Sequence, residues 1–307
     1  MKAVPVRYAL FSGCAVGHLG WPARRATIAL ARMTGIELWE APPRGCCGAR
    51  VDRPADEAVL RGIETPLTEV MSQGLAVACL SPGCRQVLAA HPLSTSQAML
   101  GADPEPAPAP QVLDVVQILT REDDPNRLAN ALVRSLSPLR VALHSICHGD
   151  HIPSPDSAPH RSTLVGVPGV PKEVGGAAER TAMTPSAQAL AGLIAVTGAA
   201  TLEDVGIEGR CAETPLLPAS TGGNMEAPPC LTVAARSGID LLVTPCFLCF
   251  GTLNERQRRL DRRDPARSVP VLHLSQLLGM ACGAAPMDLK LRHLTAQARR
   301  VLAPFVG

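Results

Sequence analysis

The chain has 307 residues, of which 46% are hydrophobic and 18% are charged. This length and composition are typical of a folded protein with one large or two ordinary domains. The formal net charge is only +2, and the arginines are scattered rather than interleaved with aromatic residues, so no nucleic-acid surface is predicted. The first residues lack the pattern of a signal peptide, and no run reaches the roughly 18 apolar residues of a membrane span. We therefore expect a cytoplasmic protein without a membrane-spanning helix.

Apolar residues recur at three- and four-residue steps in several segments, and each such segment predicts a helix. These segments lie at 22–34, 55–73, 85–91, 184–197, 227–237 and 249–260. Short buried strands are expected between them, so that each half runs three times through a strand, a cysteine-containing turn and a helix. This alternation predicts an α/β fold, with a small parallel sheet flanked by helices in each domain.

An internal repeat divides the chain into two related halves. Residues 7–14 match residues 140–147 at five of eight positions, including the final cysteine. Residues 112–119 match residues 271–278 at four of eight positions, so the repeat extends to the end of each half. We therefore predict two pseudo-symmetric domains, at residues 1–135 and 136–307.

The second domain carries an insertion at about residues 150–183 that is rich in proline, glycine and serine. Because of it, 63 residues separate Cys147 from Cys211, against 31 between Cys14 and Cys46. Long loops in compact domains are often functional. A lid, a partner-docking loop and a tolerated insertion all remain open as interpretations of this segment.

Eleven cysteines in a chain without a secretion signal indicate metal or redox chemistry, because the cytosol keeps thiols reduced. Each half supplies four candidate ligands. They are Cys14, Cys46, Cys47 and Cys84 in the first half, and Cys147, Cys211, Cys246 and Cys249 in the second. The alternative for Cys79, Cys230 and Cys282 is that they are small buried hydrophobic residues.

Four thiolates suit either an iron–sulfur cluster or a structural zinc ion. Zinc ribbons usually draw their cysteines from two closely spaced pairs, whereas Cys14 and Cys147 stand alone and Cys46 is adjacent to Cys47. A cluster with several iron atoms accommodates adjacent ligands better than one tetrahedral ion does. We therefore predict iron–sulfur clusters rather than zinc.

The order Cys, then Cys-Cys-Gly, then C-x-x-C, repeated in tandem, resembles the cysteine-rich CCG domains found in the B-type subunits of the heterodisulfide reductase family. The resemblance runs from Phe11-Ser12-Gly13-Cys14 to the segment 270–279. It implies two pseudo-symmetric CCG domains, each able to hold a non-cubane iron–sulfur cluster. It also implies an oxidoreductase acting on sulfur groups, in which a substrate disulfide is cleaved between the clusters. Electrons would come from a ferredoxin-like C-type subunit and a flavoprotein A-type subunit.

The chain departs from the family pattern once in each half. Ser81 stands where the first cysteine of C-x-x-C is expected, and Ala212 follows Cys211 where a second cysteine is expected. In the first half the Ser81 oxygen could bind iron, Cys79 could take the position, or the position could be empty. We favour a four-cysteine site there, with a cluster that could still be non-cubane. The four cysteines of the second half suit an ordinary 4Fe-4S cluster.

The reduced cysteine sets resemble heterodisulfide-reductase-like subunits of bacterial sulfur-oxidising complexes. That resemblance implies a persulfide- or lipoate-carrying protein as a partner. We expect any sulfur chemistry at the first half and electron relay at the second. One alternative is a structural subunit whose sites hold zinc or nothing. Another is the iron–sulfur subunit of a 2-hydroxy-acid or glycerol-phosphate dehydrogenase, although such relatives commonly carry C-x-x-C-x-x-C runs that this sequence lacks.

Three histidines lie close in sequence to the candidate ligands: His18, His144 and His148. Histidine titrates near neutral pH, and His148 directly follows Cys147, so His148 is the candidate proton donor to a reacting sulfur. A structural hydrogen bond is the favoured interpretation for each of the three. No catalytic residue is assigned beyond this candidate.

Overall fold

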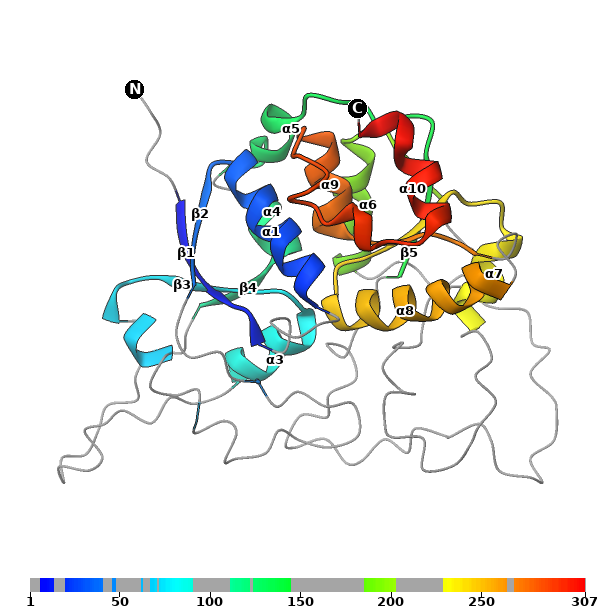
Figure 1. The fold of residues 1–307 in the computed structure, drawn as a ribbon. Coiled ribbons are helices and arrows are strands. Elements are labelled where there is room, and N and C mark those ends of the chain that lie inside the picture. Colours follow the sequence, from blue (N-terminus) through cyan, green and yellow to red (C-terminus); the bar gives the residue numbers. More distant parts are fainter. Residues whose placement is uncertain are drawn as a thin grey trace, which may run out of the picture.

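A computed structural model of the chain contains two four-stranded parallel sheets flanked by helices (Figure 1). The structure describes residues 6–13, 20–40, 46–47, 62, 67–70, 72–90, 111–121, 124–144, 185–202, 229–263 and 268–306. The predicted α/β fold with two pseudo-symmetric domains is confirmed. The expected boundary at residues 135 and 136 falls between the last strand of one sheet and the first strand of the other.

The first sheet has the strand order β2-β1-β3-β4. Its strands are β1 (Val6–Phe11), β2 (Ile36–Glu40), β3 (Ala76–Cys79) and β4 (Val112–Asp114). The helices of this half are α1 (Trp21–Met33), α3 (Pro82–Ala90), α4 (Val115–Leu119) and α5 (Arg127–Ala131). The helix predicted at 55–73 lies largely outside the described residues, although residues 67–70 are helical.

The second sheet repeats this order as β6-β5-β7-β8. Its strands are β5 (Arg140–Leu143), β6 (Ala200–Thr201), β7 (Leu241–Thr244) and β8 (Val271–His273). The helices are α6 (Pro185–Ala195), α7 (Pro229–Arg236), α8 (Phe247–Arg263), α9 (Leu274–Ala281) and α10 (Ala296–Leu302), with 3-10 turns at Leu291–His293 and Ala303–Phe305. The insertion at 150–183 lies outside the described residues.

The fourth strand of each sheet and the helix that follows it were not predicted. β4 and β8 have three residues each and run without a loop into α4 and α9. Three residues are too few for an alternating pattern, and the apolar residues of strand and helix merge into one run. The expectation of three strands in each half is therefore wrong by one strand.

The strand registers show that the sequence repeat is also a structural repeat. In the first sheet Tyr8 pairs with Ala76, and three residues further along β3 Cys79 pairs with Asp114. In the second sheet Val141 pairs with Leu241, and three residues further along β7 Thr244 pairs with His273. Asp114 and His273 therefore occupy equivalent positions, as do Cys79 and Thr244.

The first helix of each half ends in the same way. The Thr34 side chain donates to the carbonyl of Leu30, and the equivalent Thr197 donates to that of Ile194. Each threonine is followed by a glycine with positive φ, +69° at Gly35 and +85° at Gly198. A glycine at this position lets the chain leave the helix and enter the neighbouring strand, because it adopts left-handed backbone angles without steric cost.

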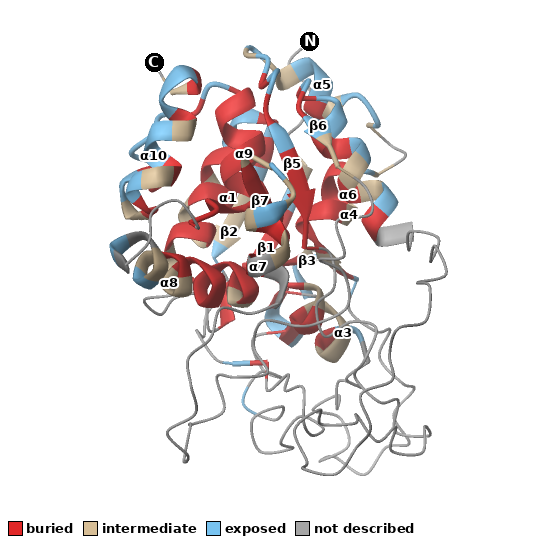
Figure 2. Cartoon of the chain, turned by 90° about the vertical axis from the view of Figure 1, so that its right-hand side faces the viewer, coloured by how far each residue is buried: buried red, intermediate tan, exposed pale blue. Residues whose placement is uncertain are grey.

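The first helix of each half packs against the helix that follows the fourth strand of the other half. Helix α1 contacts α9, and α6, the counterpart of α1, contacts α4, the counterpart of α9. Figure 1 shows the first pair as the blue and orange helices lying side by side. Figure 2 shows α9 and the inward sides of α1 and α6 in the colour of buried residues. One apolar cluster therefore runs through both halves.

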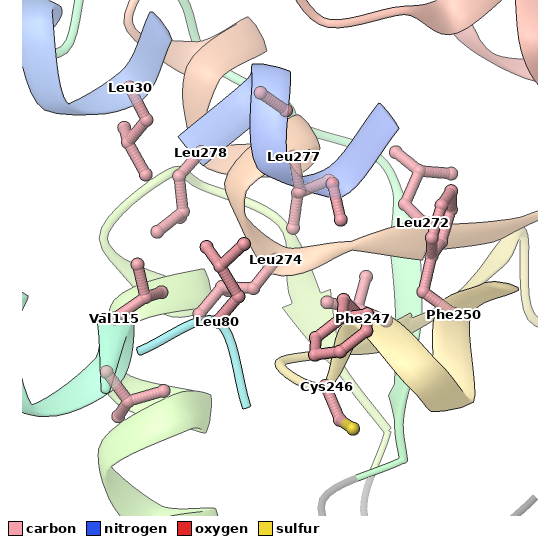
Figure 3. Close-up of a cluster of buried hydrophobic side chains, with 14 of the residues drawn as sticks. Leu30, Leu80, Val115, Cys246, Phe247, Phe250, Leu272, Leu274, Leu277 and Leu278 are labelled. Carbon is pink, nitrogen blue, oxygen red and sulfur yellow. The ribbon is translucent and has the colours of Figure 1, made fainter. Parts of the chain in front are cut away.

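The centre of this shared core lies where the third strands end. Leu80, directly after β3, is buried near Leu274 and Phe247 of the second half (Figure 3). The Phe247 N–H also donates a hydrogen bond to the Leu80 carbonyl, with 3.4 Å between nitrogen and oxygen. The two halves are thus joined by side-chain packing and by a backbone bond at the same place.

A buried pair of hydroxyls is the polar exception in the α1–α9 contact. The Thr27 and Ser275 hydroxyl oxygens lie 2.8 Å apart, and Thr27 also donates to the Ala23 carbonyl at 2.9 Å. A threonine hydroxyl has one hydrogen, so Ser275 is the donor of the pair. The equivalent positions in α6 and α4 are the apolar residues Leu190 and Val116.

We expect Thr27→Val and Ser275→Ala each to lower the free energy of unfolding by about 1–2 kcal/mol, because each leaves one buried hydroxyl or its partner unsatisfied. The double variant should lose clearly less than the sum, since it creates an apolar pair like the one across the pseudo-symmetric contact. Urea unfolding of the four proteins measures the coupling. The control is Thr34→Val combined with Ser275→Ala, in which the changes in the free energy of unfolding should add. If the changes also add in the Thr27 and Ser275 pair, the assigned bond is refuted.

Candidate functional site

The candidate ligands of the first half follow the carboxyl ends of neighbouring parallel strands. Cys46 and Cys47 come after β2, and Cys84 comes after β3. Cys14 follows β1 and lies outside the described residues. The carboxyl edge of an open parallel sheet, at the point where the strand order reverses, is the usual place for a binding site. That point lies here between β1 and β3, because the chain leaves β1 toward one side and returns to β3 on the other.

The structure brings two of these cysteines together across 37 residues of sequence. The Cys47 and Cys84 sulfur atoms are 3.2 Å apart, and the two residues are only 2% and 4% exposed. The neighbouring Cys46 is exposed. Of these two adjacent cysteines, Cys47 is therefore buried and Cys46 is at the surface. A group with several metal atoms could be bound by both.

Ser81 has a structural role at the start of α3. Its side-chain oxygen accepts a hydrogen bond from the Cys84 N–H at 3.2 Å, and Pro82 is the first helical residue. A serine at the cap followed by proline is a favoured helix start, because the hydroxyl satisfies an N–H that the helix cannot. This bond also places Cys84 in the first helical turn.

The second half repeats this turn with two cysteines. Cys246 and Cys249 lie two and five residues after Thr244, as Ser81 and Cys84 lie after Cys79. Both cysteines are fully buried at the beginning of α8, and the Cys246 N–H donates to the Thr244 hydroxyl at 3.3 Å. The strand registers thus show that Ser81 is the equivalent of Cys246. Cys147 and Cys211 lie outside the described residues.

Cys79 and Cys282 fit the interpretation as buried hydrophobic residues. Burial raises the pKa of the Cys79 thiol well above its ordinary value, and the charges of Cys84 and Asp114 raise it further. Cys79 also lines a small cavity of about 20 Å³ with apolar residues such as Leu30 and Val115. Burial raises the pKa of Cys282 to about 11. In both residues burial thus disfavours the thiolate, as is usual for a cysteine packed among apolar side chains.

The last residue of the fourth strand supports the cysteine turn in each half. Asp114 caps α4 by accepting from the Gln117 N–H at 3.0 Å, and it pairs with Arg85 Nε, next to Cys84, at 3.3 Å. His273 caps α9 in the same box with Gln276, and its Nε2 lies 3.1 Å from the Pro245 carbonyl, next to Cys246. Neither residue was predicted from the sequence, although a capping residue followed three positions later by glutamine is a readable signal.

Of the three histidines named from the sequence, the structure describes His144. His144 is buried at the end of β5, and its backbone N–H donates to the Val243 carbonyl at 2.8 Å. It occupies the position of Phe11 in the first half, which is a core residue. His18 and His148 lie outside the described residues.

The donor chemistry fits a thiolate-binding metal group. Each half places cysteines at the carboxyl edge of its sheet and in the first turn of a helix, and among those described Cys47, Cys84, Cys246 and Cys249 are buried while Cys46 is exposed. Within the described residues no group of three or more His, Cys, Asp or Glu side chains converges. The remaining cysteines of each set, Cys14, Cys147 and Cys211, follow β1, β5 and β6, whose carboxyl ends lie at the same edges.

Comparison with known proteins finds a family match in the first half. Residues 8–89, which include Cys14, Cys46, Cys47 and Cys84, match the CCG family, described as a cysteine-rich domain. The chain is also similar to the 8-methylmenaquinol:fumarate reductase membrane anchor subunit of Wolinella succinogenes. The two are 25% identical over 317 aligned residues, which cover 96% of this chain and 98% of the relative. Both comparisons favour an iron–sulfur redox subunit.

The relative's name raises the question of a membrane span. In the portion of the chain that the structure describes, no helix combines the length and the apolar character required to cross a bilayer.

Ser81→Ala should lower the free energy of unfolding by about 1 kcal/mol, because it removes the cap of α3. The matched control is Ser72→Ala, in an exposed residue whose hydroxyl donates to the Glu69 carbonyl, and this change should stay within about 0.5 kcal/mol. Urea unfolding of metal-free protein measures both. Equal, negligible effects would show that Ser81 does not cap the helix.

Proposed function

We propose that the protein is an iron–sulfur redox subunit of a larger complex, with one cluster in each half. The observation that carries the proposal is the meeting of Cys47 and Cys84 at the carboxyl edge of the first sheet, 3.2 Å apart between sulfurs. In the second half Cys246 and Cys249 lie at the start of α8, in the turn equivalent to that of Ser81 and Cys84, and this supports a second site. The match of residues 8–89 to the CCG cysteine-rich domain supports the same conclusion.

Four cysteines in each half would hold the clusters. They are Cys14, Cys46, Cys47 and Cys84 in the first half, and Cys147, Cys211, Cys246 and Cys249 in the second. When bound, such a cluster accepts and releases single electrons. We propose the 4Fe-4S type in the second half and a cluster of that or of the non-cubane type in the first. Ser81 is assigned to the helix cap rather than to iron, since its oxygen already accepts from the Cys84 N–H.

Buried residues of the chain would exclude water from the proposed cluster of the second half. Cys246, Cys249, Phe247 and Phe250 are no more than 1% exposed, so water is kept from the inner side of the second site. Figure 3 shows the Cys246 sulfur pointing away from the apolar cluster. Cys84 and Cys249 lie in the first turns of α3 and α8, and each would bind iron as a thiolate.

The proposed reaction is electron transfer to or from a disulfide- or persulfide-type sulfur substrate. The partners would be a ferredoxin-like C-type subunit, a flavoprotein A-type subunit and a persulfide- or lipoate-carrying protein, with the complex in the cytoplasm. The exposed Cys46 supports the first half as the place of sulfur chemistry, because a large sulfur-carrying partner can reach only a surface thiolate. The buried pair of the second half suits electron relay.

A second candidate is electron transfer between a quinol and a partner subunit. The similarity over 96% of the chain to a subunit of an 8-methylmenaquinol:fumarate reductase favours it. The two candidates share the clusters and differ in the molecule that exchanges electrons with them.

The Cys47→Ala variant should lose most of the signal of one cluster and keep the other, because it removes a ligand from the first half alone. Iron analysis, the visible spectrum and electron paramagnetic resonance of anaerobically reconstituted protein measure this. Cys282→Ala is the matched control and should leave iron content and spectra unchanged, since its protonated thiol lies in the core. Wild-type protein that stays colourless and iron-free after reconstitution would favour a zinc-filled or empty structural subunit.

Protein reduced with dithionite should be reoxidised by lipoamide, whose disulfide takes up two electrons and two protons to give two thiols. Absorbance of the clusters under anaerobic stopped flow follows the reaction. Cys46→Ala should slow it strongly, because the variant lacks the exposed ligand of the first cluster. A water-soluble naphthoquinone is the competing oxidant. Rapid reoxidation by the quinone, with none by lipoamide, would decide for the second candidate.

A further inference from the structure

We propose that His273 is a positioning residue for Cys246, acting as a neutral donor that fixes the backbone turn in front of this cysteine. This inference rests on the proposed function, in which Cys246 is a cluster ligand. No sequence motif or family match assigns a role to His273.

Both ring nitrogens of His273 are engaged, and their roles follow from the geometry. Nδ1 accepts a hydrogen bond from the Ser275 N–H at 3.2 Å, so it carries no hydrogen. In a neutral imidazole the hydrogen then resides on Nε2. Nε2 lies 3.1 Å from the Pro245 carbonyl oxygen and donates to it. The helix cap at α9 thus selects the tautomer that the cysteine turn needs.

The surroundings keep the ring in this state and this place. His273 is fully buried, and burial lowers its pKa to about 4, so the ring is neutral at neutral pH. The Gln276 side chain accepts from the His273 backbone N–H at 3.0 Å, and Phe250 meets the ring edge-to-face with 6.2 Å between centroids. Because these contacts fix the His273 ring, the ring in turn fixes the Pro245 carbonyl to which it donates.

The peptide groups around Cys246 are each held by a different neighbour. His273 holds the Pro245 carbonyl, the Thr244 hydroxyl accepts from the Cys246 N–H at 3.3 Å, and the Leu80 carbonyl accepts from the Phe247 N–H at 3.4 Å. The contact from His273 fixes the peptide plane immediately before Cys246. Loss of it leaves that plane held only through the bond from the Cys246 N–H to the Thr244 hydroxyl, and the Cys246 side chain would move as the plane tilts.

Comparison of the two halves explains why this donor is required only in the second. Leu80 is the counterpart of Pro245, and its carbonyl is satisfied across the interface by the Phe247 N–H. The counterpart of Phe247 is Pro82, and proline has no N–H to return the bond to Pro245. A buried carbonyl needs a donor, and His273 supplies it. In the first half the same position holds Asp114, paired with Arg85, where no such donor is needed.

Two substitutions separate positioning from capping. His273→Asn keeps an acceptor near the place of Nδ1 and remains a good helix cap, but it does not reach Pro245. His273→Gln can place its amide N–H near the position of Nε2 and keep the Pro245 bond, while it loses the cap. His273→Ser is a second capping variant, in case the asparagine protein does not fold. Gln276→Leu is the matched control, because it removes the other half of the same capping box without touching Pro245.

The first readout uses metal-free protein. Native-state alkylation by iodoacetamide, followed by peptide mass spectrometry, gives the rate at Cys246 relative to Cys249 in the same molecule. We expect this ratio to rise roughly tenfold in His273→Asn, the effect of one lost buried hydrogen bond on a local opening equilibrium. It should stay near the wild-type value in His273→Gln and Gln276→Leu.

The second readout uses reconstituted protein. The electron paramagnetic resonance signal lost in Cys246→Ala should be altered in His273→Asn and His273→Ser, and restored in His273→Gln. An unchanged alkylation ratio and signal in the two capping variants, or a larger effect in His273→Gln than in His273→Asn, would overturn the positioning role. Wild-type protein without iron would instead overturn the proposed function, and the alkylation ratio would still decide the role of His273.

Discussion

The structure depends on the packing of the two halves against each other through two pseudo-equivalent helix contacts. Helices α1 and α9 form one contact, and α6 and α4 form its counterpart. Each of these helices is buried on one side by its own sheet and on another by the opposite half, so neither half has a complete core alone. This constraint also brings together the ends of β3 and β7, where the Phe247 N–H meets the Leu80 carbonyl. The turns that carry the cysteines are therefore positioned by the packing of apolar helices, and not by contacts within the turns.

The duplicated halves differ at the residues that face the shared interface and the cysteine turns. Thr27 and Ser275 form a polar contact where the counterpart positions hold leucine and valine. Three further positions differ between the halves. Pro82 is the counterpart of Phe247, Ser81 of Cys246, and Asp114 of His273. These differences are linked, because a proline without an N–H leaves a carbonyl to be satisfied and a histidine then satisfies it. A strictly symmetric dimer could not hold both turns in this way, whereas a duplicated chain can vary each half separately.

The sequence alone predicted the repeat and the parallel sheets, and it missed the hydrogen bonds that hold the cysteine turns. The repeat that pairs residues 7–14 with 140–147 agrees with the strand registers, because buried parallel strands keep their apolar residues in place. The meeting of Cys47 and Cys84 follows from their positions after β2 and β3, the two parallel strands on either side of β1. The roles of Ser81 and His273 could not be predicted with the same ease, since each depends on a hydrogen bond whose partner is fixed by the fold. The sequence left the role of Ser81 open among an iron ligand, a position taken by Cys79 and an empty position, and the structure adds that Ser81 caps α3.

The relation between the core and the cysteines bears on how a metal group would be bound. In small zinc-dependent domains the metal supplies most of the folding free energy, and the ligands are not assembled without it. Here the turns that carry Cys84 and Cys246 are fixed by a serine cap, a threonine hydroxyl, a histidine and a backbone bond between the halves. None of these contacts uses a cysteine sulfur. The sulfur atoms can therefore be placed before any metal arrives, and the free energy of metal binding need not be spent on ordering the chain. A scaffold of this kind tolerates the loss of a ligand position in one half, because its fold does not depend on the cluster being there.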